Sequence, residues 1–331
     1  MASRGPEYAG GLANHGPMTA EALVSMGRPD AVARWVDAYS SHLEDKPASR
    51  QPVQQAAWQE ALGRFEQAGD LREFFNRQLA ESSWPSVIGI WAPRLAPGLA
   101  GVAMHGIIRA GHAARALSIR HSPARLHELA EGLAYWAARY QRLPEAATRA
   151  RGSLPPSAAP GSVARLPAGQ QRRGIFITAR LEQLESFPPF LEVADLVDTS
   201  GDASVFIGDL AATMAEHFIT QAHNPGVVIA LIHAVTGPAS IRPLLPFVDR
   251  RKRGPAAPRL AGGSGDCCYA HRPGASPRNS QPAAGRARGP SRPQRRRARD
   301  QVHRGCLREH TRSPRPEFLA AAAEAVPRLS R

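Results

Sequence analysis

Apolar residues recur at spacings of three and four along most of the chain, and this is the period of an amphipathic helix. In 70–81 the recurring residues are Leu71, Phe74, Phe75 and Leu79, with Asp70 expected as the N-cap. In 123–141 the apolar stripe includes Leu126, Leu129, Leu133, Trp136, Ala137 and Tyr140. The pattern predicts an all-α, mostly helical chain that forms one large domain with little strand.

Helices are also predicted over 18–27, 30–43, 54–67, 99–119, 204–220 and 318–329. Another is expected to begin at Asn224-Pro225, run to about Val235 and stop at Gly237-Pro238. Trp84-Pro85 is expected to break the preceding helix, and the apolar stretch Val87–Trp91 fits a helix or a strand. The stretch 150–170 is rich in Pro, Gly, Ser and Ala, which predicts a loop or linker.

Composition limits the class of protein. The chain has 331 residues, of which 43% are hydrophobic, so a sizeable core is possible. There is no run of ~18 apolar residues and no signal-like start, so we expect a cytoplasmic protein without membrane spans. The three cysteines lie late in the chain and predict no disulfide framework.

The net charge of +14 is unevenly distributed. Residues 251–331 hold 19 Lys and Arg against 5 Asp and Glu, whereas residues 1–250 hold 23 of each. The segment 251–305 is rich in Arg, Pro and Gly and contains one aromatic residue, Tyr269. We therefore predict a neutral helical domain over 1–250, a disordered basic insert over 251–305, and a helical remnant of the same domain over 306–331. Nucleic-acid binding is disfavoured, because stacking aromatics are missing from the basic region.

Histidine is the main chemical signal. The chain contains no P-loop, GxGxxG, GxSxG, HExxH or CxxC motif. Imidazole is the commonest transition-metal ligand, and histidines in apolar or turn contexts are the candidates. These are His15, His105, His112, His223 and His233.

Spacing alone leaves the roles of these histidines open. His105 and His112 are seven residues apart, which is a rise of ~10 Å on a helix, so at most one of them would bind a given ion. A single histidine in an apolar helix, such as His233, is more often a hydrogen-bonded core residue, and His15 could equally cap a turn. Arg109, one turn from His105, could bind an anionic substrate, but a salt bridge is the simpler interpretation.

Five blocks in order resemble the questin oxidase-like family. They are Tyr8-Ala-Gly-Gly-Leu-Ala-Asn-His15-Gly-Pro-Met, His105-Gly-Ile-Ile-Arg-Ala-Gly-His112-Ala-Ala-Arg, Glu131-Gly-Leu-Ala-Tyr-Trp-Ala, His223-Asn-Pro and Ile232-His233-Ala-Val-Thr-Gly. The resemblance runs from about Tyr8 to Val248 and resumes at Cys306-Leu-Arg-Glu.

This resemblance implies a helical oxidoreductase that inserts oxygen into, or opens, a polycyclic aromatic or quinone-type ring. It implies a non-heme iron site with His15, His105, His223 and His233 as metal ligands, O2 as co-substrate and NADPH as reductant. It also leaves Arg109 and His112 as catalytic candidates beside the metal.

The basic insert departs from the family pattern. The family continues with apolar helices and has a segment like Asp-Glu-His-x-Ile-Lys-Phe-Thr-Glu before Cys-Leu-Arg-Glu, and the resemblance makes the lysine of that segment a candidate metal-site residue. A compensated frameshift would explain this departure. Codons chosen for Arg296–Arg304, read one base later, permit Asp-Glu-His-Gly-Ile-Lys-Phe-Thr-Glu, and the same offset turns Leu260–Tyr269 into a good helix. A genuine disordered linker is the alternative. If the frame has shifted, we expect weak or no activity, and exposed apolar faces would favour aggregation.

A second function of a different class also fits the sequence. The chain could be a helical binding protein without enzymatic activity, whose histidines are structural and whose basic segment contacts RNA or acidic surfaces. The sequence names neither the substrate nor the oligomeric state.

Overall fold

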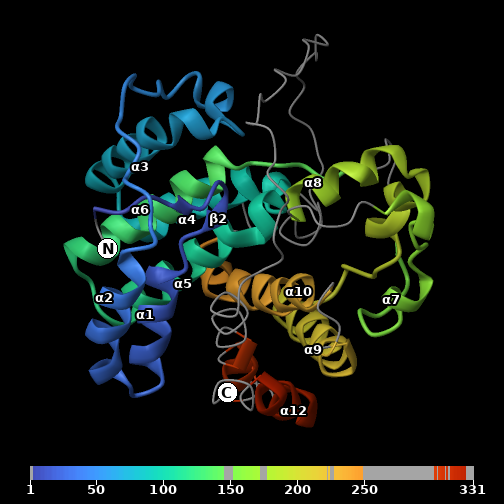
Figure 1. Cartoon of the computed structure of the whole chain (residues 1–331). Coiled ribbons are helices and arrows are strands. Elements are labelled where there is room, and N and C mark those ends of the chain that lie inside the picture. The colour runs from blue at the N-terminus through green and yellow to red at the C-terminus, as the bar shows by residue number, and fades with distance from the viewer. Residues whose placement is uncertain are drawn as a thin grey trace.

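Helices build nearly all of the described chain, which confirms the all-α prediction (Figure 1). The computed structural model describes residues 3–144, 152–171, 177–221, 223, 227–248, 302–303, 305–309, 311 and 314–325. Among these, the strands are β1 (Glu7–Tyr8) and β2 (Leu12–Ala13), which pair antiparallel near the N-terminus. The predicted insert lies almost entirely outside the described residues.

The α-helices are α1 (Gly16–Ser25), α2 (Val32–Ser40), α3 (Ala68–Glu81), α4 (Trp84–Leu95), α5 (His105–Ile119), α6 (Pro123–Ala138), α7 (Ala159–Ser162), α8 (Ile177–Leu181), α9 (Ala203–Gln221), α10 (Val228–Ile241) and α12 (Pro316–Ala325). The shorter 3-10 helices are η1 (Pro29–Ala31), η2 (Trp58–Ala61), η3 (Phe65–Gln67), η4 (Ala96–Gly98), η5 (Gly101–Met104), η6 (Ala168–Gln170), η7 (Glu182–Ser186), η8 (Pro188–Asp195) and η9 (Arg242–Phe247).

The larger hydrophobic core lies among α3, α4, α5 and α6. Trp91 is fully buried there, with its ring edge-on to Phe74 and Phe75 at centroid distances of 5.2 Å. The apolar stripes predicted on α3 and α6 supply many of the buried residues, because both helices turn the predicted face inward. Close packing of α5 on α6 is possible because Gly106 has no side chain. A Cβ atom on Gly106 would lie only 2.4 Å from the Cα atom of Trp136, which is too close.

A second hydrophobic core joins α9 and α10 to the C-terminal segment, by which we mean the described residues between 302 and 325. Val302, Cys306 and Phe318 are fully buried against these helices. Arg242, at the end of α10, forms a paired hydrogen bond with Glu309 at 3.1 and 2.7 Å. The C-terminal segment is therefore part of the folded core.

Several predicted helix boundaries are wrong. Asp70 does not cap α3; its carboxylate instead accepts the backbone N–H groups of Arg50 and Gln51, at 2.5 and 2.8 Å. The predicted helix over 54–67 is reduced to the short helices η2 and η3. Trp84-Pro85 begins α4, because proline is tolerated in a first turn and Ser83 caps the helix.

Two further boundaries differ from the prediction in the second half of the chain. The helix that carries His233 does not stop at Gly237-Pro238 but continues through Pro238 to Ile241. The last predicted helix begins at Pro316, and its expected end at Leu329 lies outside the described residues. Within the 150–170 stretch, the short helices α7 and η6 interrupt the predicted loop.

The continuous helical stretch Val228–Phe247, formed by α10 and η9, has 20 residues and is apolar enough to cross a membrane by length and composition. No other described helix meets this test. The most apolar 18 consecutive residues of this stretch are 56% buried inside the protein, and the helix contacts α5 and α9. A core helix of a folded domain has these properties.

Candidate metal centre

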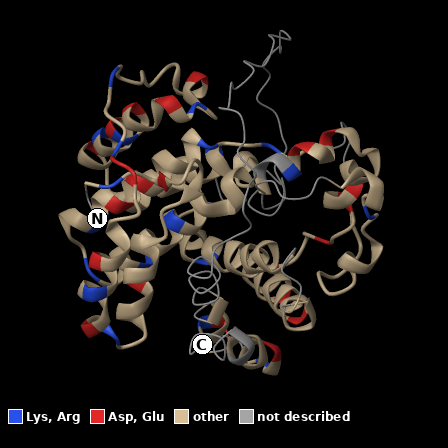
Figure 2. Cartoon of the chain, viewed as in Figure 1, with Lys and Arg blue, Asp and Glu red and all other residues tan. Residues whose placement is uncertain are grey.

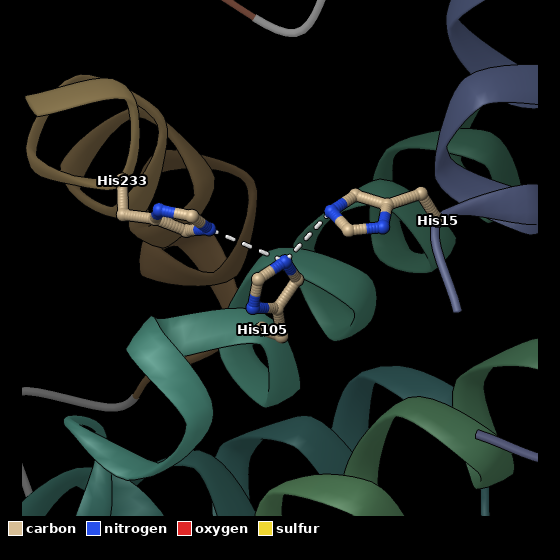
Figure 3. A group of neighbouring side chains, drawn as sticks. All are labelled: His15, His105 and His233. Carbon is tan, nitrogen blue, oxygen red and sulfur yellow. Dashed lines mark hydrogen bonds between the residues drawn. The ribbon is translucent and has the colours of Figure 1, made fainter. Parts of the chain in front are cut away.

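Three imidazoles from distant parts of the chain converge on one point (Figure 3). His15 lies at the start of α1, His105 is the first residue of α5, and His233 lies in the second turn of α10. The Nε2 atom of His105 lies 2.9 Å from Nε2 of His15 and 3.3 Å from Nε2 of His233. One ligand atom from each ring lies within 4.8 Å of the others.

The turn before α1 directs the imidazole of His15 towards this point. The backbone N–H of His15 donates to the Tyr39 hydroxyl at 2.9 Å. Asn14, which is buried, accepts the N–H of Gly16 at 2.9 Å and donates to the Gly5 carbonyl at 2.8 Å. The side chain of His15 makes no capping hydrogen bond to α1. Asn14 therefore stabilises the turn, a role that the sequence alone allowed for His15.

An unusual backbone turn positions His105. Val102, Ala103 and Met104 have φ angles of 43°, 55° and 67°, so three consecutive non-glycine residues are left-handed. Each such residue costs roughly 1–2 kcal/mol, and strain of this kind gathers at functional sites. The turn brings the Val102 carbonyl to 2.5 Å from Nδ1 of His105.

His233 is held by its own helix. Its Nδ1 atom lies 2.6 Å from the carbonyl oxygen of Ile229, one turn earlier in α10. His105 and His233 are each only 7% exposed, and their ring centroids are 4.6 Å apart. Both rings are therefore fixed in orientation within the core.

The backbone contacts determine which nitrogen of His105 and His233 carries the proton. A carbonyl oxygen can only accept, so Nδ1–H is the donor in both rings and Nε2 keeps its lone pair. Burial lowers the pKa of His233, and burial together with His233 and His15 lowers the pKa of His105 well below its usual value. Both rings are neutral at pH 7, so no hydrogen lies between their Nε2 atoms.

Two converging lone pairs without a shared proton favour a cation between them. Metal-bound histidines usually donate their other N–H to a backbone carbonyl or a carboxylate, which is the arrangement here. With metal–nitrogen bonds of about 2.1 Å, neighbouring ligand nitrogens lie about 3.0–3.4 Å apart. The 3.3 Å contact lies within this range and the 2.9 Å contact is just below it. The three histidines therefore lie close enough to bind a metal ion.

The other predicted site residues lie elsewhere. His223 is exposed in a turn after α9 and is not part of the three-histidine group. Arg109 points to α6, where its guanidinium donates to both carboxylate oxygens of Glu128 at 2.5 and 2.9 Å. This contact is the salt bridge that we expected for Arg109 as the simpler interpretation of its sequence context.

His112 lies two turns along α5 from His105, as its spacing predicted, and forms a separate cluster. Its Nδ1 atom lies 2.9 Å from a carboxylate oxygen of Glu21 on α1. Arg115 and Arg308 also contact Glu21. Sequence reasoning missed Glu21, because a glutamate in the middle of an amphipathic helix gives no sign of an inward orientation.

A second set of charges is buried beside α6. Glu131 forms an ion pair with Lys46 and lies 3.3 Å from Nε2 of His127, and Glu7 accepts hydrogen bonds from Tyr135 and Arg139. The cationic and imidazole partners lower the pKa of Glu131 to about 2, although burial opposes the shift. These pairs fix α6 to the N-terminal segment and lie outside the three-histidine group.

In comparisons with protein-family models, curated proteins and solved structures, none matches this chain. The resemblance to the questin oxidase-like family therefore rests on the five sequence blocks alone.

Proposed function

We propose that the chain is a non-heme iron oxidoreductase of the questin oxidase-like class, with the metal held by His15, His105 and His233. The observation that carries the proposal is the convergence of three Nε2 atoms, two of which have their protons directed away by backbone carbonyls. A merely structural contact between His105 and His233 would place a proton between these two rings.

The choice of iron comes from the sequence blocks. An all-imidazole donor set suits Zn, Cu, Fe and Ni. Within the described residues, no carboxylate joins the three histidines, so a bound ion would keep its positive charge and its open positions for exogenous ligands. Iron in such a site supplies the activation of O2, which protein side chains cannot provide.

The chain's own residues would position the reaction. Three neutral imidazoles bind a divalent ion without cancelling its charge, which favours the enolate or oxyanion form of a ring carbonyl beside it. The left-handed turn before α5 and the carbonyl of Ile229 hold two of the rings in ligand geometry before a metal arrives. The proposed substrate is a polycyclic aromatic or quinone-type molecule, with NADPH as reductant, as the family implies.

Oxygen uptake tests this function. The purified chain is loaded with Fe(II) under anaerobic conditions and mixed with O2, NADPH and a panel of hydroxylated anthraquinones. We expect uptake that requires both iron and an aromatic substrate, at a low rate if the reading frame is shifted. His233→Gln should abolish it, whereas His42→Gln, at an exposed position, should not.

The opposite pattern would favour the binding protein. A chain that takes up no metal, and whose salt-sensitive RNA binding disappears when residues 251–305 are deleted, is not an oxidoreductase of this kind. Iron uptake without substrate-dependent oxygen consumption, in the chain and in a frame-restored version alike, would also reject the proposed reaction.

A further inference from the structure

A pocket lies one to two helical turns from the three histidines, between α1, α5, α10 and the C-terminal segment. Ile108 of α5 and Thr236 of α10 line it, and each lies one turn beyond a histidine of the metal centre. The hollow measures about 470 Å³ with its open mouth, and its enclosed space is enough for a group of about the size of a water molecule.

A carboxylate fixes the orientation of the pocket's histidine. Nδ1 of His112 lies 2.9 Å from Glu21 and 3.0 Å from Nη2 of Arg115. A protonated Nδ1 donates to the carboxylate, and that charge-assisted bond is stronger than accepting from an arginine that already pairs with Glu21. Nε2 then keeps its lone pair, and it has no hydrogen-bond partner among the described residues.

The two hydroxyl groups of the pocket can also accept hydrogen bonds. The hydroxyl of Thr236 donates to the Ile232 carbonyl at 2.9 Å, and that of Ser240 donates to the Thr236 carbonyl at 2.7 Å. Each hydroxyl hydrogen is thus used within α10, and each oxygen still has a lone pair. Ala22, Ile108 and Ala239 give the rest of the lining an apolar character.

The arginines around His112 are all held in ion pairs, although three arginines share two carboxylates. Glu21 of α1 pairs with Arg115 of α5 and Arg308 of the C-terminal segment, and Glu309 pairs with Arg242. The residues of α10 that line the pocket carry no charge. The lone pair on Nε2 of His112 is satisfied only by a ligand that brings a hydrogen of its own, such as a hydroxyl group, and a carboxylate ligand has none to donate.

We propose that this pocket binds the hydroxyl group of a neutral, partly apolar ligand, which donates its hydrogen bond to Nε2 of His112. Glu21 is the positioning residue, since it holds the imidazole in the tautomer that leaves Nε2 free to accept. Burial and the neighbouring Arg115 lower the pKa of His112 to about 4, so the accepting form persists in mildly acidic solution.

Nitrogen NMR of the histidine rings tests the proposal on metal-free protein, so that a failure of iron binding does not affect the result. Phenol is the probe, toluene is the matched ligand without the hydroxyl, and benzoate is the anionic ligand. His112→Asn identifies the resonances of His112, because asparagine keeps a donor for Glu21 but has no atom in the position of Nε2. His42→Asn is the exposed control.

We expect the Nε2 resonance of His112 to be that of an unprotonated nitrogen at pH 6 and to move on addition of phenol but not of toluene. Phenol should bind about tenfold more weakly to His112→Asn, which is the effect of one hydrogen bond, and equally to His42→Asn. A protonated Nε2 in the wild-type chain, or a response to benzoate in place of phenol, would overturn the proposal, and neither result depends on how a variant folds.

Discussion

At the scale of single residues, the sequence singled out three histidines that lie close enough to bind a metal, but not how their rings are oriented. His15, His105 and His233 stood out because they lie in apolar or turn contexts, and the structure brings them together. Their tautomers depend on the carbonyls of Val102 and Ile229, which no sequence pattern indicates. The fourth predicted ligand, His223, lies outside the group, since α9 ends before it in an exposed turn.

A pH dependence of stability follows from His112. Its folded pKa of about 4 is lower than the ordinary value of 6.5, so the unfolded chain binds more protons between these two pH values. The free energy of unfolding should therefore fall as the pH drops from 6.5 towards 4, by up to about 1.4 kcal/mol per pH unit from this group. Urea unfolding of His112→Asn should show a flatter dependence over that range. An identical slope in the variant and the wild type would contradict the assignment.

At the scale of elements, strain and close packing around α5 position the site. The sequence predicted one helix over 99–119, but α5 begins only at His105 because three left-handed residues precede it. Nothing in Val102-Ala103-Met104 indicates a left-handed turn, since none of these residues is glycine. The turn is accommodated partly because Gly237 leaves room for the side chain of Met104.

Glycine in this turn should relieve the strain. Ala103 and Ala116 are both 9% exposed, but only Ala103 is left-handed. Ala103→Gly should leave the free energy of unfolding unchanged or raise it by up to about 1 kcal/mol, whereas Ala116→Gly, within α5, should lower it by about 1 kcal/mol. Chemical denaturation measures both, and equal losses in the two variants would mean that the turn is not strained.

The contact between α5 and α10 should be sensitive to a single methyl group. A Cβ atom on Gly111 would lie 2.2 Å from the backbone oxygen of Ser240, whereas one on Gly161 meets nothing within 4 Å. We expect Gly111→Ala to cost about 1–3 kcal/mol and to weaken metal binding, because α5 and α10 carry two of the ligands. Gly161→Ala is the control. A Gly111→Ala protein with unchanged melting temperature and metal affinity would show that this contact does not position the ligands.

At the scale of the whole molecule, positive and negative side chains are balanced over the part of the chain that the structure describes before residue 249. Figure 2 shows Lys and Arg intermixed with Asp and Glu over the described helices, in line with the 23 residues of each sign in 1–250. The family resemblance resumed at Cys306, and Cys306 is fully buried against α9 and α10. The frameshift hypothesis concerns residues that lie almost entirely outside the described ones and stays a prediction, which the coding DNA decides.

The C-terminal segment should be required for folding. Phe318 is fully buried in the second core, so Phe318→Ala should lower the free energy of unfolding by about 3–5 kcal/mol. Leu319→Ala, next to it and 45% exposed, should cost far less. Thermal melting of the two variants measures the difference. Similar melting temperatures would show that this segment does not dock as described.

Metal binding is the central claim, and equilibrium dialysis with Fe(II) under anaerobic conditions tests it most directly. The account predicts one ion per chain, lost in His105→Gln and retained in His42→Gln, and bound metal should stabilise the fold by about 2.7 kcal/mol at a hundred times the dissociation constant. Absence of bound metal in the wild-type chain, or binding that survives His105→Gln, would contradict it.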